Sequence, residues 1–357
     1  RMKLAFILYD YYPFGGLQED CLATALAATE RGHEVHLFTR TWQGPQPEEV
    51  TVHLMGKRGW SNTARNQHFF RDLASALPTF AFDGVVAFNR VPGADIYFAA
   101  DPCYRARTAD WPLWKRLGAR HRYYLNLERR IFGSSPPHTL TLTQREIVAF
   151  HRHYGVPRSR FHLLPPGVAR SETSPEARLQ NRMELRDSLG TPADAPVALF
   201  VGSGFRIKGL DRAIQAIAEV GQHVQDLEFW VVGNGKRAPF EAQARKAGAT
   251  IRFLGGRSDV DRFYDAADFL LHPAYSESAG KVLLEALTHG LPVLTTDTCG
   301  YAPHIEQSGG GSVLPSPFSQ DALNQKFLNF VTDAELRSSM REEALRYAAT
   351  EDLYSCH

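Results

Sequence analysis

The chain has 357 residues, a length that usually folds into about two domains. Hydrophobic residues make up 43% of it but never form a run of eighteen, so the sequence excludes a membrane-spanning helix. The formal net charge is only +1, yet residues 1–170 carry 22 Lys and Arg against 14 Asp and Glu while residues 171–357 carry 18 against 25, which suggests that the first half meets an acidic surface.

The first half of the chain reads as one α/β unit. Residues 3–9 (KLAFILY) form a short apolar run that is typical of a buried parallel strand. A glycine-containing loop, apolar residues at helical spacing and a second strand over 34–39 (EVHLFT) complete a strand-helix-strand unit. Residues 84–88 and 139–142 are expected to add later strands to the same sheet.

Near residue 165 this pattern stops and then starts again. Residues 165–196 contain five prolines, many charges and little apolar periodicity, which predicts a linker with one short helix. Beyond it, expected strands alternate with helical segments and cover 197–202, 227–233, 251–256, 269–274 and 292–297. The sequence therefore predicts two Rossmann-like α/β domains, over 1–165 and 166–335, that face each other across a ligand-binding cleft at the carboxyl ends of their strands.

A glycine loop follows the first strand. Gly15 and Gly16 would let the backbone approach a ligand, and the amides of the next helix could face an anion. A plain tight turn is an equally good explanation. The loop is not G-x-G-x-x-G, and Thr39 and Arg40 stand where an acid would have to bind a ribose, which disfavours a nicotinamide site.

A second glycine loop, GSGFRIKG, covers residues 202–209. It would place Arg206 and Lys208 at the mouth of the cleft, where cations suit a departing diphosphate. A solvated surface pair explains the two cations equally well.

The stretch ESAGKVLLE, residues 277–285, carries two carboxylates eight positions apart. Ser278 is a plausible N-cap, so residues 279–281 would open a helix whose amides face an anion. Glu277 could then reach a sugar hydroxyl and Glu285 a ribose diol. The alternative is an acidic first turn favoured by the helix dipole, but it explains neither an acid ahead of the cap nor an acid flanked by leucines.

These motifs resemble a known family. A strand ending in proline, Glu-x7-Glu with glycine at its fourth position, an apolar helix and GLPV (290–293) resemble the family 4 retaining glycosyltransferases of the GT-B fold. FGGLQED (14–20), LPPGV (164–168) and LGGRSDV (254–260) occur in the order that the family shows. FAADPCY, LLHPAYSESAG and VLTTDTCGYA are closer still to its lipopolysaccharide core glucosyltransferases of the glucosyltransferase I type, and the resemblance covers essentially the whole chain.

The resemblance implies a reaction. A hexose, glucose by the family default, would pass from a UDP-sugar to the inner-core heptose of lipopolysaccharide, with retention and without a metal or other cofactor. The departing phosphate would take the acceptor proton on the same face, so catalysis would consist of positioning and charge stabilisation. UDP-galactose and UDP-N-acetylgalactosamine (UDP-GalNAc) stay open as donors. The resemblance also implies that residues 336–357 form a helix that crosses back to the first domain.

The resemblance also implies roles for individual residues. Lys208 would bind the diphosphate, Glu277 would hold the transferred sugar, and Asp20 and Asp101 would line the acceptor side. The two aspartates have structural alternatives, a helix cap and a turn before proline. The family usually has Arg directly before the loop lysine, where this chain has Ile207. The expected catalytic residues are Glu277, Lys208, Asp101 and Asp20, and the expected donor-binding residues are Gly15, Gly16, Arg206, Lys208, Arg257, Ala279, Gly280, Lys281 and Glu285.

Asp259-Val260-Asp261 spells D-x-D, a metal-nucleotide signature of other transferases. Here it stands at the start of an expected helix, where capping and the helix dipole explain both acids, so no metal site is expected.

Residues 103–132 account for most of the basic excess. The segment has eight Lys and Arg against two acids, with Trp111, Trp114, Tyr123 and Tyr124 among leucines. This mixture predicts an interfacial element that meets an anionic membrane leaflet. An ordinary amphipathic helix with solvated arginines is the alternative, and nucleic acid is not expected as a partner because no RNA-binding motif is present.

The four cysteines are far apart and form neither a metal-ligand spacing nor a disulfide framework, which fits a reducing cytosol. We therefore expect a peripheral enzyme on the cytoplasmic face of the inner membrane of a Gram-negative bacterium. More distant alternatives are a UDP-sugar epimerase and a non-catalytic nucleotide-sugar-binding protein. A phosphorylase would need a pyridoxal lysine, for which no motif is seen.

Overall fold

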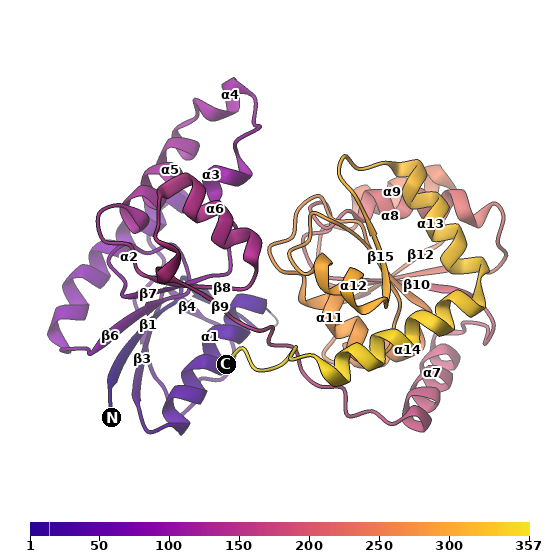
Figure 1. Ribbon diagram of the computed structural model, residues 1–357, viewed down its shortest axis with the longest axis horizontal. Coiled ribbons are helices and arrows are strands. Elements are labelled where there is room, and N and C mark those ends of the chain that lie inside the picture. The colour runs from indigo at the N-terminus through magenta and orange to yellow at the C-terminus, as the bar shows by residue number, and fades with distance from the viewer. Residues whose placement is uncertain (14) are drawn as a thin grey trace. The chain divides into compact units, whose positions relative to one another are not determined.

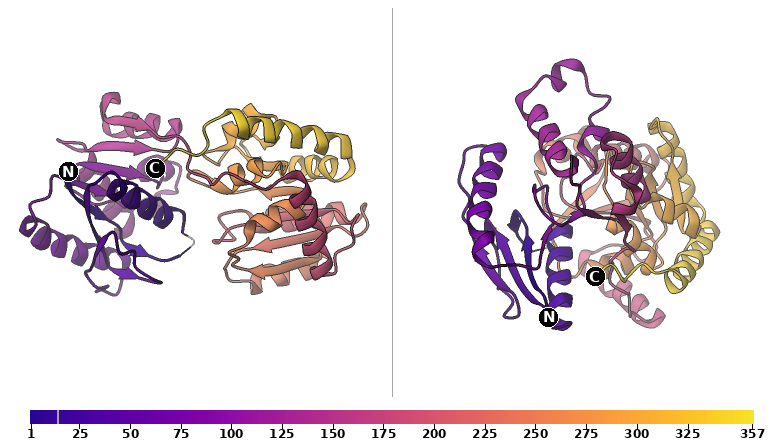
Figure 2. Two further views of the ribbon diagram at one scale, coloured as in Figure 1. Left: turned by 90° about the horizontal axis from the view of Figure 1, so that it is seen from below. Right: turned by 60° about the vertical axis from the view of Figure 1, so that its left-hand side comes forward.

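The computed structural model describes residues 1–13 and 15–357, and Phe14 of the first glycine loop lies outside them. The chain divides into two compact units (Figure 1). Unit 1 comprises residues 1–167 and 355–357, and unit 2 comprises residues 168–354. Each unit is built on a parallel sheet with helices packed against it, which confirms the predicted α/β class (Figure 2).

Unit 1 contains a seven-stranded parallel sheet in the order β5-β3-β1-β6-β7-β8-β9. Its strands are β1 Lys3–Ile7, β3 Glu34–Thr39, β5 Thr51–Leu54, β6 Gly84–Ala87, β7 Ile96–Ala99, β8 His138–Thr141 and β9 Phe161–Leu163. A separate ladder joins β2 Asp10–Tyr11 to β4 Thr41–Trp42. The helices are α1 Gly16–Glu30, α2 Asn62–Ala76, α3 Tyr104–Arg107, α4 Leu113–Arg116, α5 Ala119–Phe132 and α6 Gln144–Tyr154, with 3₁₀ turns at Leu77–Thr79 and Arg158–Arg160.

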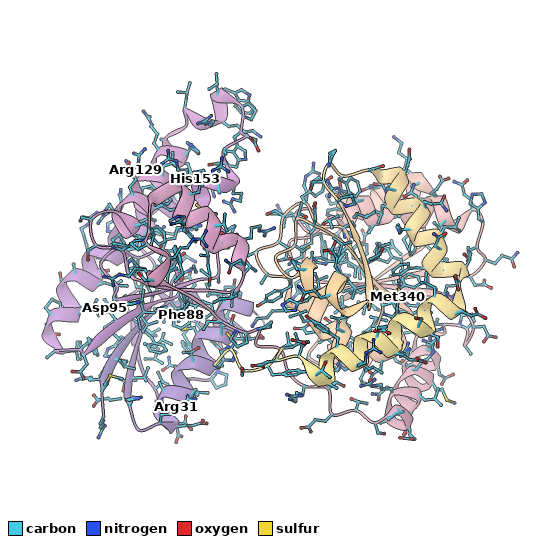
Figure 3. All side chains as sticks on the ribbon, viewed as in Figure 1. Arg31, Phe88, Asp95, Arg129, His153 and Met340 are labelled. Carbon is cyan, nitrogen blue, oxygen red and sulfur yellow. The ribbon has the colours of Figure 1, made fainter. Side chains whose placement is uncertain are left out.

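The core of unit 1 is centred on β1. This strand pairs with β3 on one side and β6 on the other, and its Ala5, Phe6 and Ile7 are buried. A strand enclosed on both faces needs a continuous apolar run, and the sequence has one there. Phe88, just after β6, lies among the packed side chains (Figure 3), with its ring centroid 5.1 Å from that of Phe98.

Unit 2 contains a six-stranded parallel sheet in the order β12-β11-β10-β13-β14-β15. Its strands are β10 Val197–Val201, β11 Glu228–Val232, β12 Ile251–Gly255, β13 Phe269–His272, β14 Val293–Thr296 and β15 Gly311–Leu314. The helices are α7 Pro175–Leu189, α8 Leu210–Gly221, α9 Ala238–Ala247, α10 Val260–Ala266, α11 Lys281–Thr288, α12 Ala302–Ser308, α13 Gln320–Thr332 and α14 Ala334–Thr350.

The strand order of unit 2 indicates where its sheet can bind a ligand. The chain runs outward from β10 to β12 and then returns to the other side of β10 as β13. The loops after β10 and β13 therefore leave the sheet in opposite directions, which is the arrangement that opens a ligand-binding crevice in an open parallel sheet. All five residues of β10 are buried, as its apolar sequence predicts.

Two features differ from the expectations. The linker helix α7 is fifteen residues long, with the Ser174 side chain accepting from the Ala177 amide as its N-cap. Helix α14, expected to cross back to the first domain, packs against α11 and α12 of unit 2. Only residues 355–357 join unit 1. In the part of the chain that the structure describes, no helix is both long and apolar enough to cross a bilayer.

Candidate active site

Two loops at neighbouring strand ends form the centre of the candidate site in unit 2. One follows β10 and the other follows β13. Gly209, in the first loop, has φ +78°, and a Cβ there would lie 2.0 Å from the carbonyl oxygen of Pro273 in the second. Only glycine allows this approach. The Tyr275 amide donates to the Ile207 carbonyl at 2.8 Å and completes the contact between the loops.

The backbone of Glu277 is held by the loop that follows β14. Glu277 forms a β-bridge with Cys299. Its amide donates to the Thr298 carbonyl at 3.3 Å, and its carbonyl accepts from the Gly300 amide at 3.1 Å. The Thr298 hydroxyl in turn donates to the Ala274 carbonyl at 2.7 Å. These bonds fix the direction of the Glu277 side chain without the help of a helix.

The Glu277 carboxylate lies between two basic groups. It forms an ion pair with the Lys208 ammonium group, and its Oε2 lies 3.4 Å from Nε2 of the fully buried His272. Burial alone would raise the pKa of Glu277, but the contacts with His272 and Lys208 lower that pKa to about 2. Burial also opposes charge on His272, yet its contacts with Cys299 and Glu277 raise the His272 pKa above the usual value. Glu277 is therefore ionised at neutral pH.

The helix after Glu277 begins later than predicted. Helix α11 starts at Lys281, and its N-cap is Gly280 in the left-handed conformation with φ +91°. The prediction that Ser278 caps this helix is therefore wrong. A residue with a Cβ is strained in that conformation, so glycine sets the helix start, and Ser278 and Ala279 belong to the preceding loop.

Glu285 lies on α11 and is bound to a residue of α10. Its Oε2 accepts from the Tyr264 hydroxyl at 2.6 Å. Burial raises the pKa of Glu285, although the Tyr264 hydrogen bond and the charge of Lys281 oppose that rise. The carboxylate that was expected to meet a ribose thus has a protein donor in the structure.

Arg206 and Ile207 line a hollow of about 480 Å³ beside the loop after β10. The remaining lining residues are Gly204, Phe205, Gly235, Lys236, Pro239 and Phe240. Half of the Ile207 side chain is exposed, so an apolar residue occupies the surface position where the family places an arginine. Arg206 and Lys236 supply positive charge to the same hollow.

Arg257 follows β12 and binds Asp259 through two nitrogens, at 2.8 Å and 2.9 Å. The second acid of the D-x-D sequence, Asp261, lies 3.4 Å from His289. Each carboxylate is thus paired with a basic side chain. The expectation of a side-chain cap by Asp259 is wrong, because its side chain makes no such bond to the start of α10.

The expected residues of the first glycine loop begin α1 in unit 1. Gly15 is the N-cap and Gly16 the first helical residue. A Cβ on Gly15 would overlap the Gln18 side chain, whereas a Cβ on Gly16 would meet open space. Asp20 lies one turn further along α1, is 2% exposed, and its Oδ1 lies 2.8 Å from Nε2 of His357.

Asp101 follows β7 and is oriented by Arg90, a residue for which the sequence gives no local signal. The Arg90 Nη1 donates to Asp101 at 3.1 Å, and Nη2 donates to the Pro102 carbonyl at 2.6 Å. Its Nε donates to the fully buried Glu128 of α5 at 3.3 Å. One guanidinium thus joins the turn that carries Asp101 to a helix of the basic segment.

Glu128 holds the start of that segment. It accepts from the Tyr104 amide at 2.6 Å, the Arg105 amide at 3.1 Å and the Tyr154 hydroxyl at 2.6 Å. These donors come from α3 and α6. A buried carboxylate needs such a set of partners, and this one anchors α3 and α5 to each other.

The basic segment 103–132 has an exposed apolar tip at its middle, around α4. It forms α3, α4 and α5, and α4 lies at the point of unit 1 farthest from the sheet, with side chains projecting from it (Figures 1 and 3). Leu113, Trp114 and Leu117 are 75%, 71% and 74% exposed. Helix α5, by contrast, buries Leu127 and Ile131 against unit 1, so the amphipathic-helix alternative describes α5 but not the tip.

The structure thus brings some predicted residues together and separates others by unit. Lys208, Glu277 and the loop 278–280 meet in unit 2, where Glu285 lies on the adjoining helix α11. Asp20 and Asp101 belong to unit 1. His272, Arg90 and Glu128 were not predicted. His272 stands in the expected strand 269–274 (FLLHPA), where a histidine among apolar residues was the available signal.

Comparisons with known proteins agree with this architecture. The model described as "Glycosyltransferase Family 4" matches residues 14–172, and the model described as "Glycosyl transferases group 1" matches residues 181–347. The lipopolysaccharide glucosyltransferase WaaG of Escherichia coli (strain K12) is 40% identical over 359 residues, which covers 99% of this chain and 96% of that protein. A D-inositol 3-phosphate glycosyltransferase of Xylanimonas cellulosilytica is 32% identical over 44% of this chain and 40% of its own length.

Solved structures show the same fold. The crystal structure of WaaG matches with a TM-score of 0.94 and 40% identity over 99% of this chain and 97% of that one. Alr3699/HepE of Anabaena, solved with UDP and glucose, matches with a TM-score of 0.75 and 17% identity over 99% and 96%. The family and the fold expected from the sequence are confirmed. The chain therefore belongs to the WaaG family of lipopolysaccharide glucosyltransferases, and it is a glycosyltransferase with the two Rossmann-like domains of the GT-B fold.

Proposed function

We propose that this protein transfers a hexose, glucose by the family default, from a UDP-sugar to the inner-core heptose of lipopolysaccharide, with retention and without a metal. The observation that carries the proposal is the Lys208–Glu277 pair, fixed in the loops that follow two neighbouring strands of one parallel sheet, β10 and β13. The relationship to WaaG supports the acceptor, and the Anabaena relative solved with UDP and glucose supports the donor class.

Lys208 and Glu277 would separate when the donor binds. The Lys208 ammonium group would turn to the diphosphate, whose charge grows as the bond to the sugar breaks. Glu277 would then accept from hydroxyl groups of the hexose. Arg206, with Ile207 in the usual arginine position, would add a second cation beside the phosphates from the rim of the hollow.

The acid–base properties of Glu277 favour a positioning role. A carboxylate with a pKa of about 2 is a weak base at neutral pH, so it is poorly suited to remove the acceptor proton. We assign that proton to the departing phosphate oxygen, on the same face of the sugar as the leaving group. The rest of the nucleotide would be bound by the amides at Ala279, Gly280 and Lys281 and by the backbone near Arg257. Glu285 would accept from the ribose after its hydrogen bond with Tyr264 breaks.

The acceptor would meet unit 1. Asp101, half exposed and oriented by Arg90, is suited to accept from a heptose hydroxyl. Gly16, whose surroundings are open, and Gly15 would leave room for the sugar beside Asp20. These assignments follow the resemblance, and the Arg90 contact adds a physical reason for the orientation of Asp101.

The tip of α4 would dock the enzyme on an anionic membrane surface, the cytoplasmic face of the inner membrane of a Gram-negative bacterium. Three large apolar side chains are more than two-thirds exposed there, and Lys115 and Arg116 lie beside them on α4. Exposed leucine and tryptophan with flanking cations are suited to the boundary between headgroups and acyl chains. Such docking would bring the enzyme to a lipid-anchored acceptor.

The test is release of UDP from a panel of UDP-hexoses, with and without core acceptor trimmed to its heptoses. We expect acceptor-dependent release from UDP-glucose, lost in Glu277→Ala. Release from UDP-galactose or UDP-GalNAc alone would keep the transferase and change the donor. Tight UDP binding with no turnover of any donor would overturn the proposal in favour of a nucleotide-sugar-binding protein.

A further inference from the structure

A cluster of three different metal-binding side chains lies in unit 1. The carboxylate of Asp20, the thiol of Cys356 and the imidazole of His357 place their ligand atoms within 4.8 Å of one another. Within residues 1–13 and 15–357, no other group of three His, Cys, Asp or Glu side chains meets this spacing. The residues come from opposite ends of the chain, and Figure 1 shows the chain end beside α1.

The tail, residues 355–357, is held at this place by one backbone hydrogen bond and one side-chain contact. The Cys356 amide donates to the Pro166 carbonyl at 3.2 Å, and His357 contacts Asp20 at 2.8 Å. Gly167 makes the approach possible, because a Cβ there would lie 2.7 Å from the Cys356 Cβ and 2.8 Å from the His357 Cε1. The backbone thus brings the thiol and the imidazole to a carboxylate that is only 2% exposed.

The spacing is close to that of a zinc site. Zinc bonds of about 2.0–2.3 Å in tetrahedral geometry put ligand atoms roughly 3.3–3.8 Å apart. The Asp20 and His357 atoms, which lie 2.8 Å apart, would therefore separate by about 0.5 Å, and a pair near the 4.8 Å limit of the cluster would close by about 1 Å. A thiolate, an imidazole and a carboxylate form a mixed ligand set that zinc accepts, and three protein ligands leave a fourth position for water.

We propose that Asp20, Cys356 and His357 form a zinc-binding site in unit 1. Binding would replace the Asp20–His357 contact with two bonds to the metal and would release the thiol proton to solvent. In a second step, which rests on the proposed function, zinc would occupy Asp20 and withdraw it from the acceptor side. The metal would then inhibit transfer, which itself proceeds without a metal.

The binding test uses the full, untagged chain with Co²⁺ as a spectroscopic probe, in a reductant that does not chelate metals. We expect one Co²⁺ per chain, the visible bands of a tetrahedral site, a near-ultraviolet thiolate-to-cobalt band, and displacement by Zn²⁺. Cys356→Ser should abolish the thiolate band, and His357→Gln should weaken Zn²⁺ binding at least tenfold, since loss of even an outer partner of a metal ligand costs about 10–100-fold.

Two matched variants control for other thiols and imidazoles. Cys103→Ser removes a thiol that is 1% exposed and whose pKa burial raises to about 12, and His223→Gln removes an exposed imidazole in unit 2. Both should bind Co²⁺ as the unmodified chain does. Gly167→Ala, which displaces the tail without touching a ligand atom, should weaken binding. Absence of the thiolate band in the unmodified chain, or equal Zn²⁺ affinity in Cys356→Ser, would overturn the site.

Inhibition is measured separately. If the proposed transferase activity is present, micromolar Zn²⁺ should reduce UDP release, a chelator should restore it, and Cys356→Ser should resist the metal while keeping its basal rate. Equal inhibition of Cys356→Ser would overturn the inhibitory role. Because the cobalt spectrum needs no turnover, failure of the transferase assignment leaves the binding test decisive.

Discussion

Lys208 and Glu277 are the side chains on which the proposed chemistry depends most. Their loops are held together by Gly209, whose lack of a side chain lets one backbone rest on the other. His272 supports the pair from within the sheet, fully buried and 3.4 Å from the carboxylate. The surroundings of Glu277 therefore fix both its direction and its charge.

Glu277→Gln keeps the size of the side chain and removes its charge. We expect kcat/KM for UDP-glucose to fall by about 10²–10³, because a preorganised charged group that faces the reacting sugar is replaced by a neutral one. Glu342→Gln, an exposed carboxylate on α14, is the matched control and should retain normal activity. Glu277→Gln with unchanged kcat/KM would remove Glu277 from the catalytic site.

The same residue makes stability depend on pH. The pKa of Glu277 falls from 4.5 to about 2 on folding, so the folded state favours the ionised form. The stabilisation is fully present above about pH 4.5 and is lost as the pH falls toward 2, with a total of about 3 kcal/mol for a shift of this size. Urea unfolding at pH 6 and pH 3 should show a larger loss of unfolding free energy for the unmodified chain than for Glu277→Gln. Parallel losses in the two proteins would contradict the low pKa.

Among the helices, α5 has two roles that depend on one carboxylate. Glu128 receives backbone amides from α3, a hydroxyl from α6 and the guanidinium of Arg90. Through Arg90 it also reaches the turn that carries Asp101. The helix thus connects the projecting segment to the expected acceptor side.

Glu128→Gln should lower the free energy of unfolding by about 3–5 kcal/mol, since removal of one partner leaves the buried Arg90 charge without its buried carboxylate. Chemical denaturation measures this loss. Asp110→Asn, an exposed acid in the same segment, should stay within about 0.5 kcal/mol of the unmodified chain. Equal stability of the two variants would mean that Glu128 does not hold the segment.

For the tip of α4 we predict the opposite: substitutions there should change membrane binding without changing the free energy of unfolding. The triple variant Leu113→Ser, Trp114→Ser, Leu117→Ser removes apolar area that is already exposed, so unfolding should be unaffected. Binding to vesicles that contain anionic lipid should fall at least tenfold. Trp60→Ser, which removes a fully exposed tryptophan outside the segment, is the control and should bind normally. Equal vesicle binding by all three proteins would exclude the tip as the docking surface.

Across the chain as a whole, positive and negative charge are divided between the two halves in a way that fits the proposed function. The excess of +8 belongs to residues 1–170, and most of it lies in the projecting segment. The excess of −7 over residues 171–357 includes Glu277 and Glu285, for which we propose a role in donor binding. Under the proposed function, a basic first domain that meets an anionic surface and a second domain that binds a nucleotide-sugar would account for the asymmetry.

Prediction from sequence succeeded where a local pattern decides the structure. The central strands β1, β10 and β11 are mostly apolar because both faces of their sheets are covered, and all three were predicted. Strands of three or four residues carry little periodicity, so their prediction was uneven. Strands β6 and β8 were predicted, whereas β5, β7, β9 and β15 were missed.

In the candidate site, too, local sequence patterns could be recognised but contacts between distant residues could not. The spacing of Glu277 and Glu285 and the glycine loop with Lys208 could be recognised, but the start of α11 after Gly280 depends on one backbone angle. The contacts of Arg90 with Glu128 join residues 38 positions apart, and those of Asp20 with His357 join residues 337 positions apart. No local pattern encodes such pairs, because tertiary packing alone brings them together.

The most direct test of the central claim is the NMR spectrum of the product. The full chain is incubated with UDP-glucose and heptose-terminated core in the presence of a chelator, and the product is purified. We expect one glucose per acceptor, joined to a heptose through an α-linkage, since retention preserves the configuration of the donor. A β-linked product, or no product until a divalent metal is supplied, would contradict the retaining, metal-independent transfer proposed for this protein.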